Sequence, residues 1–255
     1  MRTELPVDYT DESIDRTLSA LDRDGFAVVP GALSAADVAE VVSAADNLSP
    51  FASDEVRGGY RDLFNVMPVV QELATHPALR KWPEAVLGPG AFAVRAILFD
   101  KTPAANWKVP WHQDLTIAVR RRLDVPGFGP WSMKEGIQHV QPPVEVLEAM
   151  LTVRLHLDSC SPDNGPIRML PGSHRNGKLT PFDIDAWKSR VASIELPCPA
   201  GGLVLMRPLI VHASSPATHP SHRRVIHLEY AARDLPNGLD WYERRGSSGS
   251  DAAQH

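Results

Sequence analysis

Apolar residues in the first third of the chain recur every three or four positions, a spacing that favours helices. Helices are expected at residues 11–24, 35–48 and 68–87. Ser34 stands where an N-cap residue would open the second of these helices. The segment DGFAVVPG (24–31) is a short apolar run between breakers and predicts a strand. The chain is therefore expected to begin with a helical part over about residues 1–90.

From residue 91 the pattern changes to short runs rich in β-branched and aromatic residues. Strands are expected in AFAVRAILFDK (91–101), VPWHQDLTIAV (109–119), MLTVRLHLDSC (150–160), SPDNGPIRMLPGSH (161–174), GGLVLMRPLIVHASS (201–215) and HRRVIHLEYAA (222–232), with a helical turn in VEVLEAM (144–150). Residues 120–143 predict a long irregular loop, which often serves as a lid. We expect one domain over 1–245, with a β-body at about 91–233 and a mobile tail at 246–255.

The composition of the chain argues against several classes of function. The chain has 255 residues, 43% hydrophobic and 22% charged, as in ordinary globular proteins. Its formal net charge of −5 argues against nucleic acid as a partner, and no apolar run is long enough to span a membrane. The acidic, polar N-terminus does not resemble a signal peptide, and two cysteines give no disulfide framework. These features favour a cytoplasmic protein that acts on a small molecule, and they leave its oligomeric state open.

The segment WHQD (111–114) carries the strongest chemical signal. Alternation along an extended chain would place His112 and Asp114 on one face, and His212 follows a later apolar run as a third candidate ligand. Two imidazoles and one carboxylate form the facial triad that holds non-heme Fe(II) and leaves positions open for chemistry. A lone His-x-Asp pair is a weak signal in a chain with ten histidines. The three residues together indicate an oxygen-activating enzyme.

Arg223 follows His212 at the start of a further predicted strand. A guanidinium offers a planar fork for a carboxylate, as the distal end of a 2-oxoglutarate co-substrate would require. Arg224 competes for this role, but the two side chains of a strand would point to opposite faces. His227 shares the face of Arg223, where it either lines the pocket or is a buried structural histidine.

These motifs resemble the phytanoyl-CoA dioxygenase family of Fe(II)/2-oxoglutarate oxygenases. The resemblance rests on WHQD, on NGPIRMLPGSH (164–174) and on the spacing from His212 through Ser214 to Arg223, and it covers about residues 20–232. It implies a double-stranded β-helix, a cupin-like jelly roll buttressed by helices. It also implies that His112, Asp114 and His212 bind iron, while Arg223, Ser214 and Ile97 contact 2-oxoglutarate. Spacing in the family favours Arg223 over Arg224.

A second group of residues is expected to recognise substrate. In MLTVRLHLDSC the face of Leu151, Val153, Leu155 and Leu157 is apolar enough to pack on helices, which sends Arg154 and His156 into the barrel. The alternative is that both lie on a solvent face. A buried guanidinium needs an acceptor, either an internal carboxylate or an anionic substrate. The remaining candidates for substrate contact are Arg95, Trp131 and His139.

The resemblance implies that iron, 2-oxoglutarate and O₂ together hydroxylate an unactivated C–H bond of a small polar or anionic metabolite, with release of succinate and CO₂. Asp114 occupies the position that related halogenases leave open for halide, so halogenation is not expected. Two alternatives come from other classes, namely a 2-oxoglutarate-independent cupin-type metalloenzyme and a catalytically silent binding module of the same fold. Ser214 and Arg223 speak against the first, and the intact triad speaks against the second.

Overall fold

The computed structural model describes residues 10–48 and 59–246, so the predicted tail lies outside the described residues except for Gly246. The helices are α1 (Asp11–Asp24), α2 (Ala35–Asp46), α3 (Leu63–Val66), α4 (Val69–Thr75), α5 (Pro77–Leu87), α6 (Val144–Glu148) and α7 (Pro181–Lys188), with 3₁₀ turns at Pro162–Asn164 and Ser173–Asn176. The strands are β1 (Phe26–Val29), β2 (Gly59–Tyr60), β3 (Phe92–Lys101), β4 (Val109–His112), β5 (Ile117–Val119), β6 (Trp131–Lys134), β7 (Ile137–Val140), β8 (Met150–His156), β9 (Ile167–Met169), β10 (Ile194–Leu196), β11 (Leu203–Met206), β12 (His212–Ser214) and β13 (Arg223–Ala231).

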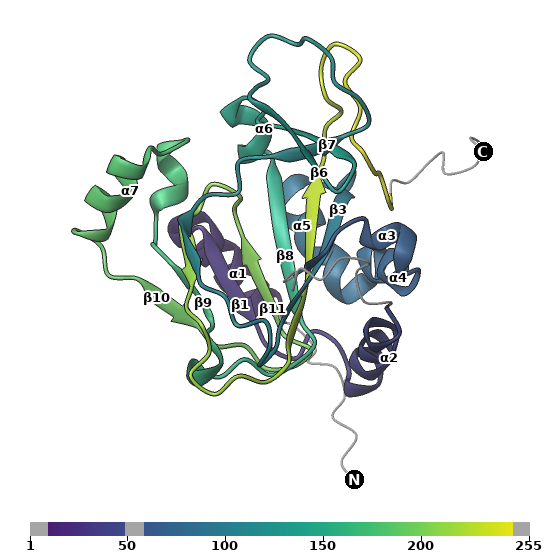
Figure 1. Cartoon of the computed structure of the whole chain (residues 1–255), viewed down its shortest axis with the longest axis vertical. Helices are drawn as coiled ribbons and strands as arrows, with labels where there is room; N and C mark the ends of the chain where they lie inside the picture. The colour runs from purple at the N-terminus through teal and green to yellow at the C-terminus, as the bar shows by residue number, and fades with distance from the viewer. Residues whose placement is uncertain (1–9, 49–58, 247–255) are drawn as a thin grey trace.

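The strands form three antiparallel sheets. A six-stranded sheet has the order β1-β11-β8-β13-β3-β2, a four-stranded sheet the order β10-β9-β12-β4, and a three-stranded sheet the order β5-β7-β6. In Figure 1, α2, α3 and α4 lie to one side of the large sheet, while β9, β10 and α7 lie to the other. Strands of the four-stranded and six-stranded sheets pack on each other through a buried apolar cluster that includes Met169 and Val204. This architecture is the expected double-stranded β-helix.

The N-terminal helices follow the sequence pattern closely. Ser34 caps α2, because its hydroxyl accepts a hydrogen bond from the Asp37 amide at 3.2 Å while the Asp37 carboxylate accepts one from the Ser34 amide at 3.3 Å. No helix in the described ranges is long and apolar enough to cross a membrane.

Two of the predicted strands are each split between sheets. The run 109–119 contains β4 in the four-stranded sheet and β5 in the three-stranded sheet, and the run 201–215 contains β11 and β12. The connection between β11 and β12 includes Leu209, Ile210 and Val211, whose side chains are at most 1% exposed. This connection is buried like a strand, so its residues are apolar like those of β11. The sequence pattern therefore does not show where β11 ends and β12 begins.

The expectation of an irregular loop at 120–143 is wrong in its second half. Strands β6 and β7 pair in register around Glu135 and Gly136, whose φ angles are +51° and +79°. Two positive φ angles in a two-residue connection are typical of a type I′ hairpin turn, for which Asn-Gly is the usual sequence signal. Glu-Gly does not give that signal, so the sequence did not predict the hairpin. It also did not predict α7 and β10 farther along the chain.

The main core lies between the large sheet and the helices. As predicted, Leu151, Val153, Leu155 and Leu157 point into it, together with buried side chains from α2, α3, α4 and α5. Thr152, Arg154 and His156 point to the other face, away from these helices, and all three are buried. The solvent-face alternative for Arg154 and His156 is therefore wrong.

Replacing Leu155 by alanine tests this packing. We expect Leu155→Ala to lower the free energy of unfolding by about 2–5 kcal/mol, the range for a cavity left by a buried leucine. Urea denaturation would measure the change. Phe182→Ala on α7 is the control, because the Phe182 side chain is 80% exposed and its loss should cost less than about 0.5 kcal/mol. Equal effects of the two substitutions would contradict the assigned core.

Candidate metal centre and its cavity

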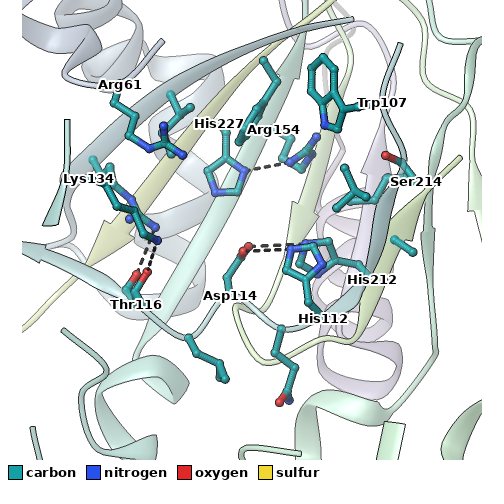
Figure 2. Close-up of a pocket in the computed structure, with 18 of the residues that line it drawn as sticks. Arg61, Trp107, His112, Asp114, Thr116, Lys134, Arg154, His212, Ser214 and His227 are labelled. Atoms are coloured by element: carbon teal, nitrogen blue, oxygen red, sulfur yellow. Dashed lines mark hydrogen bonds and ion pairs between the residues drawn. The ribbon is translucent and has the colours of Figure 1, made fainter. Parts of the chain in front are cut away.

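The three predicted metal ligands meet at the edge of the four-stranded sheet. His112 ends β4 and His212 begins β12, and the two residues are direct partners in the ladder between these strands. Nε2 of His112 lies 3.8 Å from Oδ1 of Asp114, and Nε2 of His212 lies 3.8 Å from Oδ2 of Asp114. One candidate ligand atom of each residue lies within 4.8 Å of the others. Figure 2 shows the carboxylate of Asp114 facing the two imidazole rings.

Asp114 reaches this position from a loop, which corrects the argument from strand alternation. β4 ends at His112, and the Asp114 amide donates to the Pro208 carbonyl at 3.0 Å. Between them Gln113 forms three hydrogen bonds to the neighbouring backbone. Its side-chain amide donates to the carbonyls of Gly177 and Leu209 at 2.8 and 2.7 Å, and its side-chain oxygen accepts from the Leu179 amide at 2.7 Å. These bonds fix the chain between the two ligands.

Both histidines have a tautomer that suits metal binding through Nε2. Nδ1 of His112 lies 2.8 Å from the Pro110 carbonyl, and Nδ1 of His212 lies 2.9 Å from the Ile210 carbonyl. A carbonyl only accepts, so each Nδ1 carries the hydrogen and each Nε2 keeps its lone pair. Burial lowers the pKa of His212 to about 4 despite the neighbouring Asp114 carboxylate. The imidazole of His212 is therefore neutral and available as a ligand near pH 7.

The carboxylate of Asp114 is poised for a cation. Burial alone would raise its pKa, but the side chains of His212, His227, His112 and Arg95 hold it well below its usual range. Its Oδ2 atom is buried and accepts no hydrogen bond from the described residues. A buried anionic oxygen without a partner is costly. The donor set and this unsatisfied oxygen both fit a divalent metal ion.

A cavity of about 530 Å³ opens beside the triad, within the size range of small-ligand sites. Its walls come from all three sheets, and its charged lining is almost entirely cationic. Among the described residues these charged side chains are Arg61, Arg95, Lys134, Arg154, Arg223 and Asp114. An excess of positive charge in a partly enclosed space favours anionic ligands.

Arg223 lies at one end of this cavity, with Ser214 and Ile97 also in its wall. The Arg223 guanidinium donates to the carbonyl of Gly165, and its Nε is buried without a partner in the described structure. Gly165 adopts a φ of +59°, and a Cβ there would come within 2.5 Å of the Ser215 carbonyl, so this approach requires glycine. All three predicted co-substrate residues therefore line this cavity.

Arg224 points away from the cavity. Its guanidinium binds the carboxylates of Asp158 and Asp46 at 2.8 and 2.6 Å. The register expected from the sequence, with Arg223 facing inward and Arg224 outward, is confirmed.

Lys101 is a buried cation that the sequence did not single out. It is the ladder partner of Arg223, and its ammonium donates to the Ser214 hydroxyl at 3.1 Å and to the Ser215 carbonyl at 2.8 Å. Burial and the nearby charge of Arg223 lower its pKa to about 8. The only signal in the sequence was a lysine at the end of the predicted strand 91–101. Its pairing opposite Arg223 is seen only in the structure.

Arg154 and Arg95 both line the cavity, but they have different partners. Arg95 forms a salt bridge with the buried Glu229 and donates to the Thr116 carbonyl at 3.2 Å. Arg154 donates to Nδ1 of His227 at 2.9 Å, and Nε2 of His227 lies 3.2 Å from Glu229. Because Nδ1 accepts, Nε2 carries the hydrogen that is donated to Glu229. Arg95 thus has the internal partner considered as an alternative, whereas Arg154 has no carboxylate partner among the described residues.

Three predicted substrate residues do not line the cavity. His156 is 2% exposed, His139 is 1% exposed with Nδ1 3.0 Å from the Ile137 carbonyl, and Trp131 stacks under the Arg122 guanidinium. In their place the structure brings Lys134, Arg61 and Trp107 into the wall. Lys134 was missed because its hairpin was expected to be an irregular loop.

Known proteins resemble this chain in sequence and fold. The family described as Phytanoyl-CoA dioxygenase (PhyH) matches residues 21–225. The human peroxisomal phytanoyl-CoA dioxygenase is 26% identical over 177 residues, covering 63% of this chain and 45% of that protein. Ectoine dioxygenase of Sphingopyxis alaskensis is 27% identical over 173 residues, covering 63% of this chain and 49% of that protein. The chain thus spans about half the length of the curated relatives it matches.

Solved structures share the fold. The α-ketoglutarate-dependent epimerase SnoN from nogalamycin biosynthesis superposes with a TM-score of 0.68 at 19% identity, covering 95% of this chain and 97% of that chain. EctD from S. alaskensis, solved with 2-oxoglutarate and 5-hydroxyectoine, gives a TM-score of 0.67 at 22% identity, covering 90% of this chain and 81% of that chain. Both are built on the same cupin-like body.

The buried His156 makes the stability of the protein sensitive to acid. Burial, with Arg154 and Arg223 nearby, lowers its pKa from 6.5 to about 3, and neither ring nitrogen has a hydrogen-bond partner in the described structure. Below about pH 6.5 the unfolded chain takes up a proton that the folded chain does not. The free energy of unfolding therefore falls as the pH drops from 6.5 towards 3.

We expect His156→Leu to reduce this pH dependence by up to about 1.4 kcal/mol per pH unit, the value for one proton. Urea denaturation at pH 7, 6, 5 and 4 would measure it. His139, whose pKa burial lowers to about 4, leaves a residual dependence of the same sign. The exposed His219 provides the control variant His219→Gln, which should keep the wild-type slope. An unchanged slope in His156→Leu would refute the assignment.

Proposed function

Because this chain belongs to the phytanoyl-CoA dioxygenase family, we propose that it is an Fe(II)- and 2-oxoglutarate-dependent hydroxylase of a small polar or anionic metabolite. The balanced reaction consumes substrate R–H, O₂ and 2-oxoglutarate and yields R–OH, succinate and CO₂. One oxygen atom enters the hydroxyl group and the other enters succinate. The observation that carries the proposal is the His112–Asp114–His212 cluster in the wall of a cavity lined by cations.

In this proposal His112, Asp114 and His212 hold the iron through two neutral imidazoles and one carboxylate. When bound, the metal would supply, with 2-oxoglutarate and O₂, the oxidising power for C–H cleavage. The protein orients the ligands through the carbonyls of Pro110 and Ile210. It also keeps Asp114 ionised, which supports a carboxylate ligand and leaves no small residue where a halide would bind. Hydroxylation is therefore favoured over halogenation.

Arg223 would bind the distal carboxylate of 2-oxoglutarate. Its inward position, its buried Nε and the adjacent Ser214 hydroxyl support this role. Lys101 adds positive charge behind Ser214. Ile97 supplies an apolar wall for the methylene groups. Arg223 and Lys101 argue against a cupin-type metalloenzyme that works without 2-oxoglutarate, because such an enzyme would not need these buried cations beside its metal.

A catalytically silent binding module of the same fold is the other alternative. The complete donor set argues against it, because a bound cation would offset the cost of the unsatisfied Asp114 oxygen. Residues 1–245 would make up a single oxygenase domain.

Removing one ligand tests the metal site. We expect His212→Ala to weaken binding of Fe(II) at least about 10-fold, the lower range for disturbing a metal site, and to abolish succinate formation. Anaerobic titration with Fe(II) measures the affinity, and circular dichroism checks the fold. The exposed His219 offers the control His219→Ala, which should bind Fe(II) as the wild type does. Wild-type Fe(II) affinity in a folded His212→Ala protein would exclude this centre.

The adjacent arginines give a matched pair for the co-substrate. We expect Arg223→Gln to weaken 2-oxoglutarate binding by about 2–5 kcal/mol, the range for truncating one partner of a buried charge pair. Arg224→Gln should leave the affinity unchanged, because its guanidinium faces Asp158 and Asp46. Calorimetric titration of 2-oxoglutarate into the anaerobic Fe(II) protein measures both. If Arg224→Gln weakened binding and Arg223→Gln did not, the co-substrate would bind at the opposite face of β13 and the assignment to Arg223 would be wrong.

A further inference from the structure

We propose that Lys134 and Arg61 form a second anion site in the cavity, which binds a carboxylate, phosphate or phosphonate group of the primary substrate. The inference rests on the proposed function, because it names the substrate class of that same site. It differs from the expectation drawn from the sequence, in which Arg154 and Arg95 recognise the anion.

Lys134 is held in the cavity wall without a carboxylate partner. It ends β6, and its ammonium donates to the Thr116 hydroxyl at 3.2 Å, while no ion pair joins it to another described residue. Burial, Arg95 and Arg61 lower its pKa more than Asp114 and Glu229 raise it, so positive charge outweighs negative charge around the ammonium. Its hydrogen bond to a neutral hydroxyl does not offset this charge. An anionic ligand would relieve the repulsion.

The β6–β7 hairpin brings Arg61 to the same place. Glu135 in the hairpin turn binds the Arg61 guanidinium at 2.6 Å, and it adopts a φ of +51°, which is uncommon for a residue other than glycine. Lys134 and Glu135 thus project from adjacent positions, one into the cavity and the other onto Arg61. The ion pair orients Arg61 beside Lys134 in the cavity wall and still leaves donors on its guanidinium.

The other cations are less suited to this role. Arg95 is neutralised by Glu229, whose carboxylate also accepts from His227. Burial and the nearby charge of Arg223 lower the pKa of Arg154, so Arg154 lies close to Arg223. Arg154 therefore faces the region that 2-oxoglutarate would fill. Lys134 and Arg61 remain for the substrate.

The two anion sites lie on opposite sides of the metal ligands. Figure 2 shows Lys134, Arg61 and Thr116 on one side of Asp114, and Ser214 on the other side beyond the two histidines. A substrate anchored at Lys134 would thus extend towards the metal ligands from the side opposite the co-substrate. Since the cavity of about 530 Å³ also holds 2-oxoglutarate, the substrate is a small acid whose oxidised C–H bond lies between its anionic group and the metal.

The test is calorimetric titration of three probes of similar size, namely butyrate, propylphosphonate and the neutral butyramide. The protein is anaerobic, loaded with Fe(II) and saturated with 2-oxoglutarate, so that Arg223 is occupied. The variants are Lys134→Gln, Arg61→Gln and the charge-conserving Lys134→Arg. Lys188→Gln on α7 and Arg121→Gln are the controls, because both side chains are exposed and neither lines the cavity. The affinity for 2-oxoglutarate is measured for every variant.

We expect at least one of the two anions to bind the wild type about 10-fold more tightly than butyramide, and the stronger anion identifies the carboxylate or phosphonate class. Lys134→Gln should weaken that anion about 10-fold and Arg61→Gln by a smaller factor, with the 2-oxoglutarate affinity within about 2-fold of wild type. Lys134→Arg should retain most of the affinity, and both controls should match the wild type.

Equal binding of butyramide and the anions, or wild-type anion affinity in Lys134→Gln, would overturn the inference and leave the proposed function standing. A parallel loss of anion and 2-oxoglutarate affinity in Lys134→Gln would also overturn it, by placing Lys134 at the co-substrate. Failure of the wild type to bind 2-oxoglutarate would instead reject the proposed function. The anion site would still be decided by the Lys134 comparison, repeated without 2-oxoglutarate.

Discussion

The register between β4 and β12 is the constraint on which the candidate centre depends. His112 and His212 are direct partners in this antiparallel ladder, although a hundred residues separate them in sequence. A shift of one residue would turn His212 to the opposite face of the sheet and separate the imidazoles. The buried connection before β12 and the hydrogen bonds of Gln113 hold this register. The carboxylate of Asp114 then needs only a short loop to reach the two rings.

Charge is the second organising feature. Five cationic side chains and one carboxylate line the cavity among the described residues, and Glu229 lies behind the wall to balance Arg95. The protein keeps the remaining cations partly desolvated, which is costly unless anions bind. The proposed ligands, a dicarboxylate co-substrate and an anionic substrate, would supply the missing negative charge. The same electrostatic argument thus supports both proposed ligands.

The large sheet and its helices act as the rigid support. The face of β8 made by Leu151, Val153 and Leu155 packs into the helical core, and the alternate residues therefore point to the other face of the sheet, from which Arg154 lines the cavity. On β13 the same alternation turns Arg223 inward and Arg224 outward to its carboxylates. A side chain on a strand buried on both faces has little freedom to move. Positions on rigid strands suit a site that must hold two ligands in fixed relation.

The sequence by itself determined the candidate ligand types and the inward face of β8, because periodicity and chemical type are local properties of the chain. The preference for Arg223 over Arg224 came from the spacing in the resembled family. The sequence did not determine where strands break, since buried connections such as Leu209–Val211 carry the same apolar pattern as strands. It also missed Lys101, Lys134 and Arg61. Their roles arise from the neighbours that the folded chain gives them: Lys101 from its pairing opposite Arg223, and Lys134 from a hairpin whose turn signal is weak. Whether a cation is neutralised, as Arg95 is by Glu229, depends on contacts between distant segments, so only the tertiary structure decided it.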